Sequence, residues 1–256
     1  MDQVVHISPL LTALVTVVSP LAAFLYQSLL GKRDQSGIVS LLAIALSFTG
    51  GGLTWFTIWN NAPVTVQADW FTIGETSFKV GILLNNLSTL MLFLVPTVAL
   101  PVHVYSRAYM KGDPGIHRYW MYLSLFCFAM LGLVIMDSLL LMYVFWELVG
   151  FASYLLIGFW FTRETAVQAN KKAFLVNRIG DLGFLIGLAI VFTQFKTLNL
   201  VDLFGDNGLL YQSAIVDGLW VSPVNSLPQI WFTLGGLAFF LAAMAKSAQF
   251  PLHEIG

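Results

Sequence analysis

The stretch Leu139-Leu-Leu-Met-Tyr-Val-Phe-Trp-Glu147-Leu-Val-Gly-Phe-Ala-Ser-Tyr154 decides the fold, because it is a long apolar segment with one carboxylate near its centre. Glu147 lies about nine residues into a predicted helix, hence roughly 13 Å deep, near the middle of a ~30 Å hydrocarbon layer. A charge at that depth costs about 2.5–3.5 kcal/mol on insertion scales, so it is retained where it is paired or faces water. The segment therefore predicts a membrane helix that carries either a functional carboxylate or a protonated acid bonded to another helix.

The rest of the chain has the same apolar character. Of its 256 residues, 58% are hydrophobic and 10% are charged, with a net charge of −1 and a mean hydropathy of +0.81. This composition excludes a disordered chain and a nucleic-acid binder with a basic face, and it argues against a soluble enzyme. The one cysteine, Cys127, excludes a disulfide framework and a cysteine-held cluster within this chain. We expect an all-α polytopic membrane protein.

A membrane span needs about 20 mostly apolar residues. Seven segments qualify, at roughly 8–30, 38–60, 82–106, 118–137, 138–161, 172–195 and 229–251. The last should break near Pro251, because proline has no N–H to donate to the preceding turn. Alternating polar and apolar residues over 61–81 predict a small external β-hairpin, and residues 196–228 predict one short helix near 198–204.

Basic residues predict the orientation of these spans. Eight Lys and Arg fall in odd-numbered loops and two in even-numbered loops, so the positive-inside rule places the N-terminus outside. The loop residues are Lys32, Arg33, Arg107, Lys111, Arg118, Arg163, Lys171 and Lys172 against Lys79 and Lys196.

Three further charged groups lie inside predicted spans. Arg178 and Asp181 are three residues apart, so they share one face of the sixth helix. They are either a structural ion pair or a pair that tunes its neighbours. Lys246 precedes the predicted break at Pro251, where it is either a hydrated proton site or a lysine that snorkels to the interface.

Other ionisable residues are weaker candidates. His253 follows the break and could relay protons, and Asp137 is expected to cap a tight hairpin turn between two spans. His103 and His117 are expected at the surface, on either side of a cytoplasmic loop.

Five segments, in order, resemble the antiporter-like L-type subunit of proton-pumping NADH:quinone oxidoreductase (respiratory complex I). They are Tyr105-Ser-Arg-Ala-Tyr-Met110, Asp137-Ser-Leu-Leu-Leu-Met-Tyr-Val-Phe-Trp-Glu147, Ser153-Tyr-Leu-Leu-Ile-Gly-Phe159, Lys172-Ala-Phe-Leu-Val-Asn-Arg-Ile-Gly-Asp181 and Ala245-Lys-Ser-Ala-Gln-Phe-Pro-Leu-His253.

The resemblance implies proton translocation through the matched charges. Glu147 and Lys246 would form a switchable ion pair, and Arg178 and Asp181 would influence that lysine. The chain itself would carry no redox chemistry, cofactor or metal, because NADH, FMN, Fe–S clusters and quinone belong to partner subunits. Its partners would be other membrane-arm subunits and the lipid bilayer of a bacterial inner membrane. No nucleic acid and no small substrate other than protons is expected.

The resemblance also implies a domain division and a missing part. Residues 1–116 would hold helices one to three with the hairpin, and residues 117–256 would begin the antiporter-like repeat. Such subunits are more than twice as long, so this chain looks like an N-terminal portion that departs from the family at Asn86 and over 254–256. Two alternatives stay open: a subunit of a multisubunit Na⁺/H⁺ antiporter, and a truncated scaffold that does not transport.

Overall fold

The computed structural model describes residues 8–30, 35–74 and 76–252, and contacts divide the chain into two compact units. The first unit comprises residues 1–66, 82–135 and 151–156, and the second comprises residues 67–81, 136–150 and 157–256.

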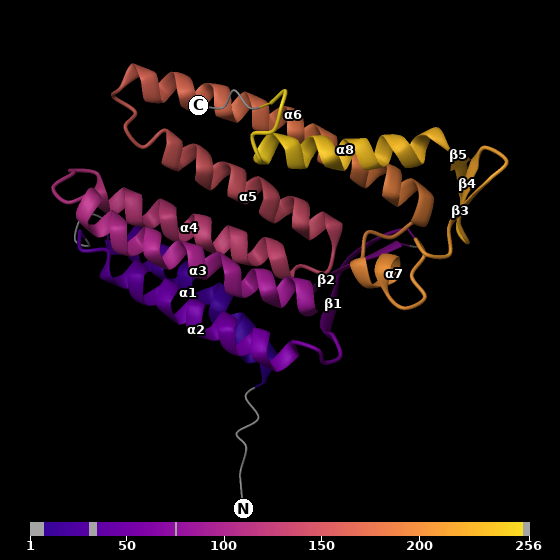
Figure 1. Ribbon diagram of the computed structural model, residues 1–256, viewed down its shortest axis with the longest axis horizontal. Helices are drawn as coiled ribbons and strands as arrows, with labels where there is room; N and C mark the ends of the chain where they lie inside the picture. The colour runs from indigo at the N-terminus through magenta and orange to yellow at the C-terminus, as the bar shows by residue number, and fades with distance from the viewer. Residues whose placement is uncertain (1–7, 31–34, 75, 253–256) are drawn as a thin grey trace, which may run out of the picture. The chain divides into compact units, whose positions relative to one another are not determined.

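Four helices that lie side by side build the first unit (Figure 1). They are α1 (Pro9–Leu30), α2 (Ile38–Ile58), α3 (Asn86–Tyr109) and α4 (Ile116–Ile135). Hydroxyl groups join α1 to α2: the Oγ atoms of Ser19 and Ser47 lie 2.8 Å apart, and Thr54 donates to Thr12 Oγ1 at 2.7 Å. Such hydrogen bonds and close packing hold membrane helices together, since lipid tails are as apolar as leucine.

Local sequence explains where α3 begins. The Asn85 side chain accepts a hydrogen bond from the Ser88 backbone N–H, and the Ser88 hydroxyl accepts one from the Asn85 N–H, each at 2.8 Å. This reciprocal cap satisfies two N–H groups that the first turn of a helix leaves without partners.

The second unit is built on two helices that lie alongside one another (Figure 1). They are α6 (Glu164–Phe195) and α8 (Ile230–Lys246), against which the first part of α5 (Leu139–Ile157) packs. Phe184 and Leu188 of α6 form the core with Ala242 of α8 and with Tyr143 and Trp146 of α5.

Short elements complete this unit. The helix α7 (Leu200–Phe204) precedes an antiparallel sheet of β3 (Ala214–Val216), β4 (Leu219–Val221) and β5 (Ser226–Pro228). The strands β1 (Val64–Ile73) and β2 (Thr76–Leu84) pair with each other, and residues 67–81 of this hairpin belong to the second unit. The predicted hairpin and the predicted short helix are therefore confirmed, whereas the three-stranded sheet was not predicted.

Glycines allow α6 and α8 to approach closely. A Cβ on Gly183 would lie 2.7 Å from the backbone oxygen of Ala238, and a Cβ on Gly187 would lie 2.8 Å from the ring of Phe239. Gly180 abuts Ala245 in the same way. These glycines are three and four residues apart, so they form one face of α6 that fixes the position of α8 and of the lysine at its end.

The prediction of a polytopic helical membrane protein is confirmed, with differences in helix length. Six helices of the described residues are long and apolar enough to cross a membrane, and α8, with 17 residues, is shorter. The helix α6 begins at Glu164, eight residues before the predicted span, because a helix continues past the point where its sequence turns polar. The helix α8 ends at Lys246, and Pro251 lies in a turn beyond it. The division after residue 116 stays a prediction.

The close approach of α6 and α8 can be tested with Gly183→Ala. The added methyl group collides with backbone, so we expect a loss of about 1–3 kcal/mol in the free energy of unfolding, measured by thermal denaturation in detergent. Gly236→Ala is the matched control, because a Cβ there meets nothing within 4 Å. Equal melting temperatures of the two variants would contradict the proposed packing.

Candidate functional site

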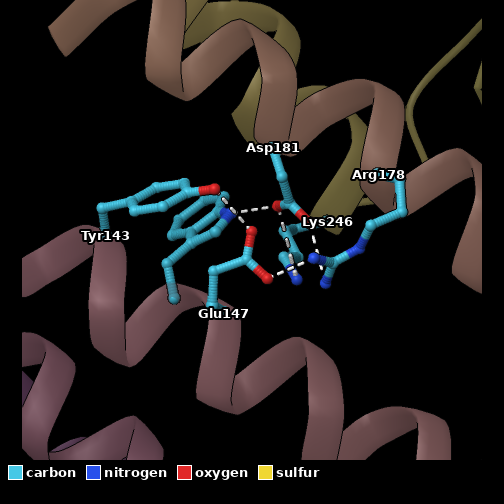
Figure 2. A network of polar contacts seen from close by, with 6 residues as sticks. Tyr143, Glu147, Arg178, Asp181 and Lys246 are labelled. Atoms are coloured by element: carbon cyan, nitrogen blue, oxygen red, sulfur yellow. Dashed lines mark hydrogen bonds and ion pairs between the residues drawn. The ribbon is translucent and has the colours of Figure 1, made fainter.

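The helix α5 presents Glu147 to the interior of the second unit. Tyr143, one helical turn earlier, donates its hydroxyl to Glu147 Oε1 at 2.8 Å. The other carboxylate oxygen of Glu147 forms an ion pair with Arg178, so both oxygens have a partner (Figure 2). Two donors on one carboxylate offset much of the cost of placing it among apolar helices.

The helix α6 supplies a cation and an anion from one face. Arg178 Nη2 lies 3.1 Å from Asp181 Oδ2 in the pair predicted from their three-residue spacing. The Asp181 side chain is only 3% exposed, and its Oδ1 accepts a hydrogen bond of 2.8 Å from Trp146 Nε1. The guanidinium carbon of Arg178 also lies 5.0 Å from the centre of the Phe174 ring.

The last residue of α8 completes the cluster. Lys246 Nζ lies 3.9 Å from Asp181 Oδ1 and 5.6 Å from the centre of the Trp146 ring. The ammonium is buried and makes no hydrogen bond to any residue that the structure describes. It approaches α5 at Gly150, where a Cβ would lie 2.6 Å from Nζ, so a larger residue at this position would make the ammonium shift.

Charges alternate in sign through this cluster. The order is Glu147, Arg178, Asp181, Lys246, with two anions and two cations drawn from α5, α6 and α8 (Figure 2). A neutral, connected set is the arrangement in which a low-dielectric interior tolerates ionised groups. Arg178 and Asp181 therefore lie between Glu147 and Lys246 in the series of ion pairs.

The structure brings together all four side chains that the sequence singled out, but not in the order that the resemblance implied. Lys246 pairs with Asp181, and in the described part of the chain no ion pair joins it to Glu147. The work of these residues in transport stays a prediction.

Tyr143 and Trp146 were missed as members of the site. The sequence analysis names no aromatic residue as part of the site, yet these two donate to Glu147 and Asp181. A signal was present for Tyr143, which precedes Glu147 by four residues and so shares its face. Nothing in the spacing along α5 links Trp146 to a residue of α6.

The weaker candidates have other surroundings. Asp137 is fully buried, and its Oδ2 accepts from Gln67 Nε2 at 2.7 Å and from Asn199 Nδ2 at 3.1 Å, so it joins the turn before α5 to β1 and to the start of α7. The predicted surface position of His103 is wrong, because this residue is only 1% exposed. His253 lies outside the described residues. Within those residues no group of three His, Cys, Asp or Glu could hold a metal ion.

Membrane-length apolar helices and an alternating chain of four charges, of which Asp181 is buried and the others are partly buried, define a polytopic membrane protein with an ion-pair network between its helices. Residues 136–254 match the family described as NADH:quinone oxidoreductase/Mrp antiporter, TM. Residues 70–120 match the family described as NADH-ubiquinone oxidoreductase (complex I), chain 5 N-terminus.

Relatives agree with these matches. The chain is 38% identical over 251 residues to NAD(P)H-quinone oxidoreductase chain 5 of Picosynechococcus sp.. The aligned region makes up 97% of this chain and 36% of the relative. It is 38% identical over 225 residues to the chloroplastic NAD(P)H-quinone oxidoreductase subunit 5 of Nephroselmis olivacea. That aligned region makes up 86% of this chain and 33% of the relative. The Mrp complex of Dietzia sp. shares the fold, with a TM-score of 0.68, 22% identity and coverage of 96% of this chain and 24% of that one.

The chain therefore belongs to the NADH:quinone oxidoreductase/Mrp antiporter family and is similar to the L-type subunit, chain 5. It spans about a third of the length of these curated relatives.

Removal of the shared carboxylate should destabilise the cluster. Asp181→Asn removes the counter-charge of Lys246 and one of the two that face Arg178, so we expect the free energy of unfolding to fall by about 3–5 kcal/mol. Lys246→Met in the same chain should restore part of this loss, which thermal denaturation of both single variants and the double variant would show. The exposed acid Asp202, changed to Asn, is the control. Strict additivity of the two changes would contradict a direct Asp181–Lys246 interaction.

Proposed function

We propose that the chain is part of a proton-translocating membrane-arm subunit of NADH:quinone oxidoreductase. Its own residues move protons, and partner subunits with NADH, FMN, Fe–S clusters and quinone carry the electron transfer. The observation that supports this most is the ion-pair chain Glu147–Arg178–Asp181–Lys246, which crosses from α5 to α8 through α6.

The attraction within one ion pair is similar in size to the free energy needed to move one proton across the membrane potential. Moving one proton against ~150 mV requires about 3.5 kcal/mol, since 100 mV corresponds to about 2.3 kcal/mol per charge. Two unit charges about 4 Å apart attract each other by about 4 kcal/mol at the effective dielectric typical of proteins. Forming or breaking one pair such as Asp181–Lys246 is therefore commensurate with one proton moved across the membrane potential.

The proposed steps use this chain's residues in a fixed order. A proton enters along the face of α6 that carries Lys171, Arg178 and Asp181, and it loads Lys246. A shift of Arg178 between Glu147 and Asp181 changes the negative charge that faces the lysine, and so changes how tightly the lysine holds its proton. Redox events in partner subunits would drive that shift.

The proposed setting follows from the basic residues and the relatives. An integral membrane protein with its N-terminus outside places Lys111 and Lys172 on the cytoplasmic side. A bacterial inner membrane is proposed, and the chloroplastic relatives make an organellar energy-coupling membrane the other possibility.

A second candidate function is a subunit of a Na⁺/H⁺ antiporter. It is favoured by the family description, which includes Mrp antiporters, and by the likeness to the Mrp complex. Such a subunit would exchange cations down a gradient and would not depend on electron transfer.

The test is Lys246→Ala in the full-length protein within its complex, in inverted membrane vesicles. We expect NADH-driven acidification to fall at least tenfold, because the proton carrier is gone, while NADH oxidation by the uncoupled membranes persists. Lys79→Ala, an exposed lysine of β2, is the matched control.

Three outcomes would count against the proposal. Acidification that follows an imposed Na⁺ gradient, with no response to NADH, would favour the antiporter. Unchanged pumping in the Lys246→Ala vesicles would refute a role for this lysine. Loss of the assembled complex with no separate effect on flux would indicate a scaffold.

A further inference from the structure

Trp146 contacts both members of the Asp181–Lys246 pair. Its Nε1 donates to Asp181 Oδ1 at 2.8 Å, and its ring centre lies 5.6 Å from Lys246 Nζ. The oxygen that accepts the indole N–H is also the one nearest to the lysine, at 3.9 Å.

The pair is held apart by this arrangement. Charge-assisted hydrogen bonds between an ammonium and a carboxylate are normally about 2.7–2.9 Å long, so a separation of 3.9 Å leaves the pair open. Trp146 donates a hydrogen bond to Oδ1, the oxygen that the lysine faces. Arg178 Nη2 lies 3.1 Å from Oδ2 as an ion pair, and Oδ2 accepts no hydrogen bond from the described residues. The ammonium of Lys246 lies over the face of the Trp146 indole, whose π electrons attract a cation.

The ring that does this is fixed in place. The Trp146 and Phe184 rings lie 5.3 Å apart, and Phe184 packs in turn against Phe239 of α8 at 5.3 Å. Trp146 of α5 thus contacts both α6 and α8. Its N–H points to Asp181, and its ring faces Lys246.

We propose that Trp146 is a positioning residue that keeps the Asp181–Lys246 pair open, by occupying the carboxylate oxygen and supporting the ammonium with its ring. This rests on the proposed function. A lysine so placed has no hydrogen bond to a carboxylate in the described part of the chain, and is therefore ready to exchange its proton.

Three substitutions separate this role from simple packing. Trp146→Phe keeps a ring face and removes the N–H, so Lys246 should close on Asp181 Oδ1. Trp146→Tyr keeps a donor at the end of the ring and should retain part of the wild-type behaviour. Trp160→Phe is the matched control, because Trp160 stacks on Arg163 outside the cluster.

Two measurements on the full-length protein in its complex decide the matter. In infrared pH titrations, the carboxylate band that is lost in Asp181→Asn should shift in Trp146→Phe and not in Trp160→Phe. In vesicles, Trp146→Phe should slow pumping about tenfold and move the rising limb of its pH profile upward by about one pH unit, because a closed pair holds its proton more tightly. The pumping rate should be highest in the wild type, lower in Trp146→Tyr and lowest in Trp146→Phe.

The outcomes distinguish the two proposals. If Lys246→Ala abolishes pumping and Trp146→Phe matches Trp160→Phe in both measurements, the role of Trp146 is refuted and the proposed function stands. If Lys246→Ala pumps normally, the proposed function fails and the transport role of Trp146 fails with it, whatever the infrared band shows. Equal rates for the phenylalanine and tyrosine variants, both assembled, would indicate packing alone.

Discussion

The Asp181 carboxylate, 3% exposed and shared between two cations, is the interaction on which the second unit depends. An anion in such surroundings is tolerated only where opposite charges and donors replace the water that it has lost. Arg178 comes from its own helix, but Lys246 must be brought from α8 and the indole N–H from α5. The packing of three helices is therefore a condition for one ionised side chain.

Glycines meet that condition at two places. On α6 they let α8 approach closely enough to place its last residue beside Asp181, and Gly150 of α5 leaves space for the ammonium. An ammonium at the end of a helix would otherwise reach for the nearest polar surface, as lysines near helix ends do. In this structure the side chain of Lys246 is 17% exposed and turned inward, which makes it a partner of the network.

Hydropathy and the cost of buried charge predict much of this from the sequence. They give the spans to within a few residues at most ends, and they single out Glu147, Arg178, Asp181 and Lys246. The Arg178–Asp181 pair follows from the spacing of the two residues along α6. The pairs between helices were not predictable, because they depend on which face of α6 turns toward α5 and α8.

The same limit explains the errors outside the cluster. His103 is near the end of α3, which suggested a surface position, yet it stacks on Trp120 of α4 at 6.2 Å between ring centres. Asp137 looked like a local cap, but its amide partners lie 70 and 62 residues away in the chain. Contacts of that sequence separation leave no trace in spacing or periodicity.

The neutrality of the cluster is the property that links its structure to the proposed transport. Two anions and two cations balance, so a proton added to Glu147 or Asp181, or lost from Lys246, leaves an unmatched charge among apolar helices. Such a charge is costly until a partner moves or a second proton leaves. In the proposed function, protonation and side-chain rearrangement are therefore coupled by electrostatics across the three helices α5, α6 and α8.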